Sequence, residues 1–403
     1  MQRKWKHSLA GVALLLALGA SPATANDFNV GGGNVAALIQ AINDANDEAA
    51  NPGADTIILD GSTFTLTEIN NNTLGNNGLP VITSEIIIEG NGGTIHRSSA
   101  GGTPAFRIIA INGSGDLTLN ETTISGGLAN AGGFYGSAGG GIFNFGTATM
   151  TNNTISENTA DAGGGIYNGG GTATFINSTI SGNTVDNSGG GIFNRGAVEI
   201  INSTISGNDS GNYGGGIYND DTSDIQNTIV SGNTAEGPGD NCFDSGTIND
   251  NGSNLSNDAT CGFSGDNNNS INLGPLADNG GHTLTHALVS GSSAIDAGND
   301  AVCNASPVNG ADQRGISRPQ LSSCDIGAFE FIDQNNNNID DCVDTNFFAD
   351  IDGDGVSDFC DALIGDITPA PTLSQWGMIA FGFIAGMFGL GFLRRKKGLV
   401  VRG

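Results

Sequence analysis

Positively charged residues are nearly absent from the body of this 403-residue chain. Lysine occurs only within the first six residues and near the C-terminus, and the segment 26–393 holds five arginines against all 41 acidic residues. A protein that binds nucleic acid needs Lys and Arg to neutralise phosphates, so this composition argues against nucleic acid as a partner. Divalent cations, basic partners or simple solubility remain as reasons for the negative charge.

Leucine and long apolar runs are scarce in the centre of the chain, where glycine and asparagine dominate. The apolar runs there are three to five residues long and rich in β-branched or aromatic residues, which suits strands and is too short for helices. The scarcity of leucine excludes a leucine-rich repeat. The composition therefore predicts short strands separated by turns.

A repeat of about 25 residues occupies the stretch from Thr147 to Asn233. In-phase positions are Met150, Phe175, Ile200 and Ile225; Ile155, Ile180, Ile205 and Val230; Asn152, Asn177, Asn202 and Asn227; and Asn158, Asn183, Asn208 and Asn233. A second motif, GGGI(F/Y)N, recurs at Ile142, Ile166, Ile192 and Ile217. About 25 residues is enough for one coil of three short strands, whereas a propeller blade needs roughly 40 to 50. The period predicts an all-β fold, a parallel β-helix.

Equivalent residues of successive coils should lie directly above one another, at the inter-strand spacing of about 4.8 Å. The two apolar sets then form interior columns, in a stack of roughly nine or ten coils. We expect the two asparagine sets at turns, where Asn tolerates left-handed backbone and its amide can bond the coils above and below. The alternative is a row of ligand contacts.

The N-terminal region carries two further signals. A basic start, an apolar core from Leu9 to Leu18 and the small residues Ala23-Thr24-Ala25 give residues 1–25 the form of a cleaved secretory signal peptide. An amphipathic pattern predicts a helix over 34–46, which could plug the open end of a solenoid. The segment from Thr56 to Leu59 is then expected to be the first strand.

The segment 266–331, which follows the β-helix of residues 26–265, contains the strings GPLADNGGHTLTHALVSGSSAIDAGN, ADQRGISRP and CDIGAFE. These strings resemble the end region of bacterial choice-of-anchor Q proteins, which implies a secreted, right-handed parallel β-helix. His282 stands where that family would have proline. We interpret the charged residues of the segment 266–331 as forming salt bridges and turn hydrogen bonds that close the end of the β-helix. They are Asp296, Asp312, Arg314, Arg318, Asp325 and Glu330.

Acidic residues alternate along a loop in the linker 332–368, with Gly355 at the turn. The residues are Asp350, Asp352, Asp354, Asp358 and Asp361. Alternating carboxylates suit an oxygen cage for Ca²⁺, and the loop resembles the calcium repeats of thrombospondin type 3. A weaker copy consists of Asp333, Asn335, Asn337 and Asp341. The resemblance implies structural Ca²⁺, and a solvated acidic linker is the alternative.

The last segment, 369–403, combines a short motif, an apolar run over 377–393 and a basic cluster that should stay cytoplasmic. The motif is Pro371, Thr372, Leu373, Ser374, Gln375, Trp376 and Gly377. It resembles the IPTL-CTERM sorting signal of Gram-negative bacteria, although Ala370 and Gln375 depart from the usual Ile and Glu. The resemblance implies a transmembrane helix in the inner membrane, an exosortase-type enzyme as partner and a final location at the cell surface. An ordinary anchor without processing is the alternative.

Six cysteines lie in the part expected to be exported, and none has a metal-binding spacing such as CxxC. An oxidising compartment favours disulfides. Proximity in sequence favours the pairs Cys242–Cys261, Cys303–Cys324 and Cys342–Cys360, which is one of fifteen connectivities.

No catalytic constellation stands out, so we expect a non-catalytic role in adhesion or in the extracellular matrix. The alternative is a β-helix that cleaves or binds a polysaccharide, as a lyase or hydrolase. Its candidate site would be Asp220, Asp221, Asp224 and Arg195, although we favour an acidic turn. His282 and His286 could pair on a metal if helical, but the surrounding Thr and Val favour a strand.

Overall fold

The computed structural model describes residues 25–133, 135–264 and 270–333, together with 335, 337, 339–342 and 360. Several predicted features lie outside the described residues: the signal peptide up to residue 24, the stronger of the two calcium loops apart from Cys360, the sorting motif and the apolar run 377–393. No helix within the described ranges has the length and apolar character needed to cross a membrane.

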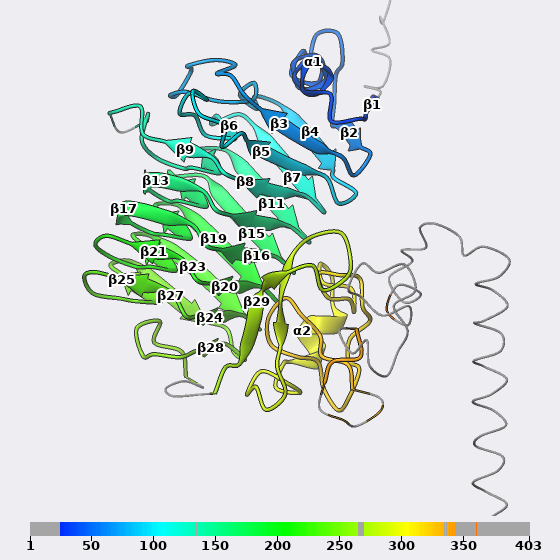
Figure 1. Cartoon of the computed structure of the whole chain (residues 1–403), viewed down its shortest axis with the longest axis vertical. Coiled ribbons are helices and arrows are strands. Elements are labelled where there is room, and N and C mark those ends of the chain that lie inside the picture. The colour runs from blue at the N-terminus through cyan, green and yellow to red at the C-terminus, as the bar shows by residue number, and fades with distance from the viewer. Residues whose placement is uncertain are drawn as a thin grey trace, which may run out of the picture.

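Parallel strands stack into a solenoid whose successive coils rise along one axis (Figure 1). The first sheet has nine strands: β1 (Asp27–Val30), β2 (Asp55–Leu59), β4 (Glu85–Glu89), β7 (Asp116–Asn120), β11 (Thr147–Thr151), β15 (Thr172–Ile176), β19 (Ala197–Ile201), β23 (Thr222–Gln226) and β27 (Thr247–Asp250). The second sheet has eight: β3 (Thr63–Leu66), β5 (Thr94–Arg97), β8 (Thr123–Ser125), β12 (Thr154–Ser156), β16 (Thr179–Ser181), β20 (Thr204–Ser206), β24 (Ile229–Ser231) and β28 (Leu255–Ser256).

Two smaller sheets complete the coils. The third sheet holds the GGGI(F/Y)N motif: β6 (Ile109–Ile111), β10 (Ile142–Asn144), β14 (Ile166–Asn168), β18 (Ile192–Asn194), β22 (Ile217–Asn219) and β26 (Cys242–Asp244). The fourth is β9 (Leu128–Ala129), β13 (Thr159–Ala162), β17 (Thr184–Ser188), β21 (Asp209–Ser210) and β25 (Thr234–Ala235). This arrangement is that expected of a β-helix.

The register predicted from the repeat is confirmed. Met150 pairs with Phe175, Phe175 with Ile200 and Ile200 with Ile225 in adjacent strands of the first sheet. All four side chains are fully buried in one continuous core, which also contains the Ile155 column. Because the side chains of a strand alternate between its two faces, one face of each strand contributes side chains to this core and the other faces outward.

The N-terminal region begins with a strand that the sequence did not predict. β1 precedes the helix and pairs in parallel with β2, so the segment from Thr56 to Leu59 belongs to the second strand of the sheet. A strand of four residues with one buried side chain has too weak a pattern to be recognised alone.

The helix expected over 34–46 is α1 (Val35–Ala45), and the Asn34 side chain accepts a hydrogen bond from the Ala37 amide at 3.1 Å, as an N-cap does. Its buried residues include Leu38 and Ile42, which join the main core. α1 lies beside the first strands, at the N-terminal end of the stack (Figure 1).

Candidate functional site

Two rows of buried amides run through the solenoid. In the first, the Nδ2 of Asn158 donates to Asn183 Oδ1 at 3.0 Å, Asn183 to Asn208 at 2.9 Å and Asn208 to Asn233 at 2.9 Å. These side chains are 0–5% exposed. The internal amide ladder predicted for this set is therefore confirmed.

The second row consists of the asparagines of the GGGI(F/Y)N motif, a ladder that the sequence did not predict. Asn144 donates to Asn168, Asn168 to Asn194, Asn194 to Asn219 and Asn219 to Asp244, at 2.8–2.9 Å. Every donor points toward the next coil, so the last member needs only to accept. A carboxylate is an acceptor-only group, and Asp244 fits that position.

The other set, Asn152, Asn177, Asn202 and Asn227, behaves differently from the prediction of an internal ladder. All four have the expected left-handed backbone, with φ between 46° and 57°. The side chains of the last three, however, bond residues far along the chain: Asn177 Nδ2 donates to Ala311 O at 3.0 Å, and Asn227 Nδ2 to Asn299 O at 3.3 Å. The left-handed turn directs these amides outward, where they hold the C-terminal part of the protein.

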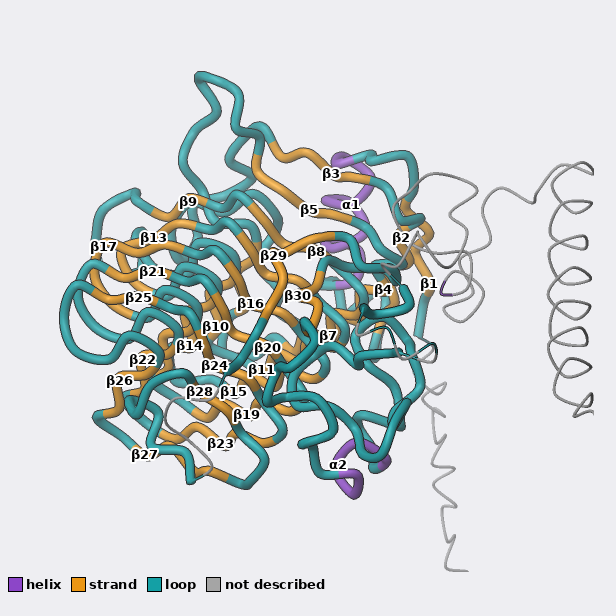
Figure 2. Tube along the Cα trace, turned by 60° about the horizontal axis from the view of Figure 1, so that its bottom comes forward, coloured by secondary structure: helices purple, strands orange, loops and turns teal. Residues whose placement is uncertain are grey.

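The residues that accept hydrogen bonds from these asparagine side chains belong to 270–332, which we call the flank segment. It contains the antiparallel hairpin of β29 (Leu273–Ala277) and β30 (Thr285–Leu288), and α2 (Asp300–Asn304). The hairpin lies across the strands of the second sheet (Figure 2). The outward threonines of that sheet make the contacts: Thr154 Oγ1 donates to Leu284 O at 2.6 Å, Thr179 Oγ1 to Gln313 Oε1 at 2.6 Å, and Thr204 Oγ1 accepts from Ala328 N at 3.0 Å.

The expectation that this segment closes the end of the helix is therefore wrong. It lies along the side, from Glu121, which contacts His282, to Ile229 and Leu255, which share one hydrophobic cluster with Phe329 and Phe331. The last coil is covered instead by Cys261 and Phe263, which are 5% and 4% exposed and join the main core beside Cys242. Outward Thr and Ser look solvent-exposed in sequence, so the pattern gave no sign that they would be covered.

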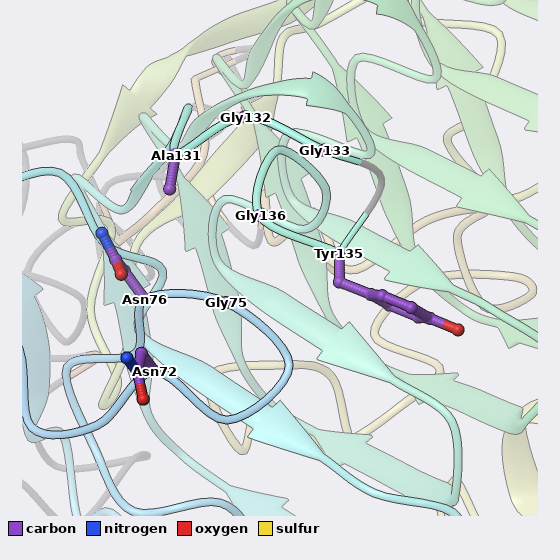
Figure 3. Close-up of a pocket in the computed structure, with 8 residues that line it drawn as sticks. All are labelled: Asn72, Gly75, Asn76, Ala131, Gly132, Gly133, Tyr135 and Gly136. Atoms are coloured by element: carbon purple, nitrogen blue, oxygen red, sulfur yellow. The ribbon is translucent and has the colours of Figure 1, made fainter.

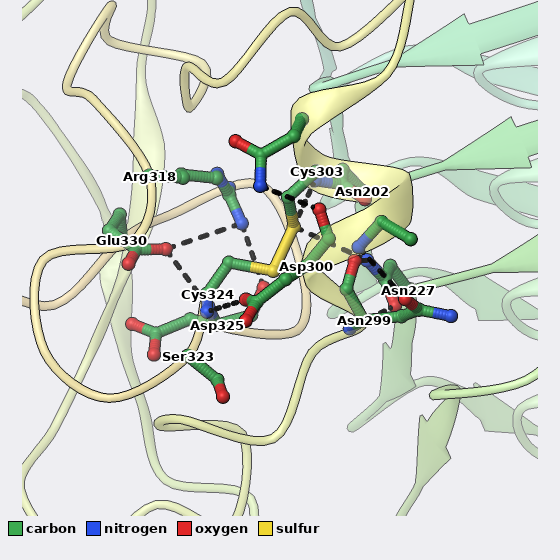
Figure 4. Close-up of a disulfide and its surroundings, with 12 residues drawn as sticks. Asn202, Asn227, Asn299, Asp300, Cys303, Arg318, Ser323, Cys324, Asp325 and Glu330 are labelled. Atoms are coloured by element: carbon green, nitrogen blue, oxygen red, sulfur yellow. Dashed lines mark hydrogen bonds and ion pairs between the residues drawn. A yellow bond between two sulfur atoms is a disulfide. The ribbon is translucent and has the colours of Figure 1, made fainter.

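Charged residues of the flank segment are buried, and Figure 4 shows Arg318, Asp325 and Glu330 beside the Cys303–Cys324 disulfide. Arg314 pairs with Asp312 at 2.9 Å and Arg318 with Glu330 at 3.5 Å, and all four side chains are at most 1% exposed. Both Asp325 oxygens accept backbone N–H groups, from Asp296 and Phe331. The expected salt bridges and turn bonds are present, and they hold the flank segment together internally.

Burial, and secondarily the charge of Glu330, raises the pKa of Asp325 to about 8, and burial also raises the pKa of Glu330. A carboxyl whose folded pKa exceeds its unfolded value of 3.8 stabilises the fold fully at pH below that value, and this contribution is lost as the pH rises to about 8. We therefore expect the flank segment to open more readily at pH 9 than at pH 6. The rate of limited proteolysis of the folded protein at pH 6 and pH 9 measures this opening. Asp325→Asn should reduce the difference between the two rates.

The two histidines bind separate partners. His282 Nδ1 contacts Glu121 Oε2 at the surface, and the pKa of Glu121 is lowered by its hydrogen bond to His282. His286 Nε2 lies 2.9 Å from Ser181 Oγ, and its Nδ1 lies 2.8 Å from Gly274 O. Burial lowers the pKa of His286. His286 lies in β30, His282 lies before this strand, and the two rings contact different partners. Within the described residues, no three His, Cys, Asp or Glu side chains gather as metal ligands.

The candidate polysaccharide site is partly brought together. Arg195 Nε bonds Asp220 Oδ2 at 3.0 Å, and Ser245 Oγ donates to Asp220 Oδ1 at 2.9 Å. Asp221 follows in the same turn, whereas Asp224 accepts from Asn249 in the next coil at 2.9 Å. The carboxylates therefore hold neighbouring coils together.

A column of aromatic rings on the outside of the third sheet lies beside this site. Phe143, Tyr167, Phe193, Tyr218 and Phe243 stack with centroids 4.5–5.4 Å apart and planes inclined by 15–17°. Phe143, Tyr167 and Phe193 are at most 7% exposed, so their faces pack on one another and hold neighbouring coils together.

The described part of the weaker calcium loop has a converging set of oxygens. The backbone N–H of Asn337 donates to Asp333 Oδ1 at 3.0 Å and to Asn335 Oδ1 at 2.9 Å. The side-chain Nδ2 of Asn335 donates to Asp341 Oδ1 at 3.0 Å. Oxygens of the Asp333, Asn335 and Asp341 side chains thus lie round one turn, and oxygen donors of this kind are those that Ca²⁺ prefers. The donor set fits the ion; Asp350, Asp352, Asp354, Asp358 and Asp361 lie outside the described residues.

The cysteines pair as proximity in sequence predicted. The bonds are Cys242–Cys261, Cys303–Cys324 and Cys342–Cys360. All three lie after the clean repeat: one at the last coil, one inside the flank segment and one in the linker. The amide rows of the solenoid need no covalent support, whereas the irregular C-terminal part is cross-linked.

Comparison with known proteins yields one match. No curated protein and no solved structure matches the chain. Residues 368–395, however, match the family model of the IPTL-CTERM motif. The predicted sorting motif lies inside this match. It is a C-terminal signal recognised by an exosortase-type enzyme, and it indicates a secreted, surface-sorted protein.

Proposed function

We propose that this protein is a surface-sorted solenoid that acts without catalysis, in adhesion or as a component of the extracellular matrix. The match of residues 368–395 to a sorting signal carries the proposal. It is supported by a body whose inward polar groups are used in amide ladders and whose outward second sheet is covered by its own chain. Such a body suits a rigid spacer or scaffold.

The finer architecture follows from the same proposal. The signal peptide 1–25 directs export, and a transmembrane helix over 377–393 holds the precursor in the inner membrane. The solenoid is a right-handed β-helix whose N-terminal end is plugged by α1. The choice-of-anchor Q-like segment, which we place at 266–331, braces its flank.

Removal of residues 368–395 should abolish surface sorting. The full chain should be reached by protease added to intact cells, whereas the truncated chain should be found in the periplasm or the medium. Fractionation with a tag placed near Asn26 measures the distribution. Alanine substitution of 362–367, just before the motif, is the control and should leave the surface fraction unchanged. Surface retention of the truncated chain would contradict the assigned role of the motif.

We further propose that Ca²⁺ rigidifies the linker 332–368, through Asp333, Asn335, Asn337 and Asp341 and through the stronger loop of Asp350, Asp352, Asp354, Asp358 and Asp361. An ion that binds only the folded linker stabilises it by about 2.7 kcal/mol at a concentration 100 times its dissociation constant. Calorimetric titration of the full chain in mild detergent should show two classes of site. Asp341→Ala should remove one class and Asp278→Ala neither; equal heats from both variants would remove the first loop from the proposal.

A second candidate function is binding or cleavage of a polysaccharide at the turn of Arg195 and Asp220. Their ion pair is exposed on the outer surface, with side-chain exposures of 44% and 36%. Incubating the purified protein with acidic and neutral polysaccharides, and measuring reducing ends and unsaturated products, separates the two functions. Turnover that is lost in Asp220→Asn would replace the non-catalytic proposal.

A further inference from the structure

A hollow of about 340 Å³ lies between a loop around Asn76 and a glycine-rich loop around Gly132 (Figure 3). None of the described residues that line it is charged, so its lining does not select a ligand by charge. A better-defined feature lies at the N-terminal end of the solenoid, beside β1 and α1 (Figure 1): the buried carboxylate of Asp55.

Asp55 is the first residue of β2 and is 0% exposed. Its Oδ1 accepts a hydrogen bond from the backbone N–H of Asn26 at 2.8 Å, whereas its Oδ2 has no hydrogen-bond partner among the described residues. None of the ion pairs in the described part of the chain includes this carboxylate. A buried carboxylate that meets a single neutral N–H is costly, because burial removes the hydration of its charge.

The Asn26 nitrogen is held against this carboxylate by the other contacts of the residue. The Asn26 carbonyl accepts from the Thr56 amide at 2.9 Å, where the pairing of β1 with β2 begins. Asn26 Nδ2 donates to Asn51 Oδ1 at 3.0 Å, and Asn51 Nδ2 donates in turn to the carbonyl of Asp44 in α1 at 2.8 Å. Asn26 therefore connects β1, β2 and α1 at one point.

The bond before Asn26 is the one at which the signal peptide is expected to be cleaved. Ala25 is exposed, and hydrolysis of the Ala25–Asn26 bond by water leaves a carboxylate on Ala25 and an α-amine on Asn26. An α-amine is protonated at neutral pH. The nitrogen beside Asp55 thereby gains a positive charge and additional N–H groups, which the unpaired Oδ2 of the same carboxylate can accept.

We propose that the exported protein begins at Asn26 and that its α-ammonium forms a buried ion pair with Asp55, which fixes β1 and α1 to the N-terminal end of the core. This inference rests on the signal peptide proposed above. The pair acts on the core because Val30 of β1 and Leu38 and Ile42 of α1 belong to it. Charge-assisted hydrogen bonds are roughly twice as strong as neutral ones, so an uncleaved chain should hold this end less firmly.

Two chains that differ by one residue test the ion pair. One begins at Asn26, and the other begins at Ala25, which moves the ammonium one residue away from Asp55. Both are released from an exported fusion by a protease that leaves no extra residue, in a host without an exosortase. Hydrogen exchange of the full chains in mild detergent should be about tenfold slower in β1 and α1 of the chain that begins at Asn26, and equal in the strands of the clean repeat.

Asp55→Asn keeps the size and one acceptor oxygen but removes the charge, so it should abolish the difference in exchange between the two chains. Asp60→Asn is the matched control. Asp60 is exposed and accepts from the Gly32 amide at 2.7 Å at the same end of the solenoid, and the difference should persist in this variant.

Equal exchange in the two unsubstituted chains would overturn the ion pair, and this comparison holds even if Asp55→Asn does not fold. A difference that survives Asp55→Asn would overturn it as well. Mass spectrometry of the exported protein tests the cleavage site separately, because a first residue other than Asn26 would contradict the proposed signal peptide and the ion pair together. Surface sorting depends on residues 368–395 and is measured by cell fractionation, so it stands or falls independently.

Discussion

Asn183→Ala should destabilise the solenoid by about 3–5 kcal/mol. The Asn183 side chain is fully buried in the middle of an amide row. Its Oδ1 accepts the backbone and side-chain N–H groups of Asn158, and its Nδ2 donates to Ile155 O and Asn208 Oδ1. Each buried polar group left without a partner costs about 1–3 kcal/mol. Alanine at this position leaves several such groups without a hydrogen-bond partner in the two neighbouring coils.

Urea unfolding followed by circular dichroism measures this loss as a lower midpoint. Asn187→Ala is the matched control: Asn187 is an exposed residue of the same coil, and its loss should cost less than about 0.5 kcal/mol. Because each coil contacts only its neighbours, the damage should spread from the affected coil to those on either side. If the two variants unfold at the same midpoint, the amide row does not hold the coils together.

Arg314→Met should unfold the flank segment while leaving the solenoid folded. The Arg314 side chain is fully buried, pairs with Asp312 and donates to the carbonyls of Asn279 and Glu330. Its Cζ lies 3.5 Å from the centre of the Phe329 ring. Removing one partner of a buried ion pair costs about 3–5 kcal/mol, because the other charge stays buried and unpaired. Hydrogen exchange should therefore accelerate across 283–331 and remain slow in the strands of the repeat.

The same substitution at the surface gives the control. Arg195→Met removes an ion pair of which both members are solvent-exposed, and such pairs contribute less than about 1 kcal/mol. Adding Asp312→Asn to Arg314→Met should restore part of the lost protection, since the unpaired charge is then gone. Unchanged exchange in the flank segment of Arg314→Met would show that the buried charges are not what holds it.

The part of the fold that could be predicted is the part that repeats. Because the period is fixed, one correct pairing of strands predicts the pairing of every later coil. The columns of Met150 and Ile155 therefore follow from counting residues. The left-handed turns at Asn152 and its equivalents follow as well, since asparagine is among the few residues that adopt that backbone.

The direction of the asparagine side chains could not be predicted, because inward and outward amides have the same period. Asn158 enters a ladder and Asn177 reaches Ala311, although each recurs every 25 residues. The position of the flank segment on the solenoid could not be predicted for a related reason. Its contacts join residues more than 100 positions apart, such as Thr179 and Gln313, and no local pattern encodes such a distance.

The flank segment gives the solenoid a fixed length. Each amide row passes its hydrogen bonds in one direction, from coil to coil, so a duplicated 25-residue unit would satisfy both rows and could be inserted without cost to the interior. The flank segment tolerates no such change, because its contacts run from Glu121 to Ile229 in one register. One additional coil would move every later anchor by about 4.8 Å. The interior of the solenoid could therefore accept additional coils, whereas the flank segment fits only a fixed number of coils between its contacts.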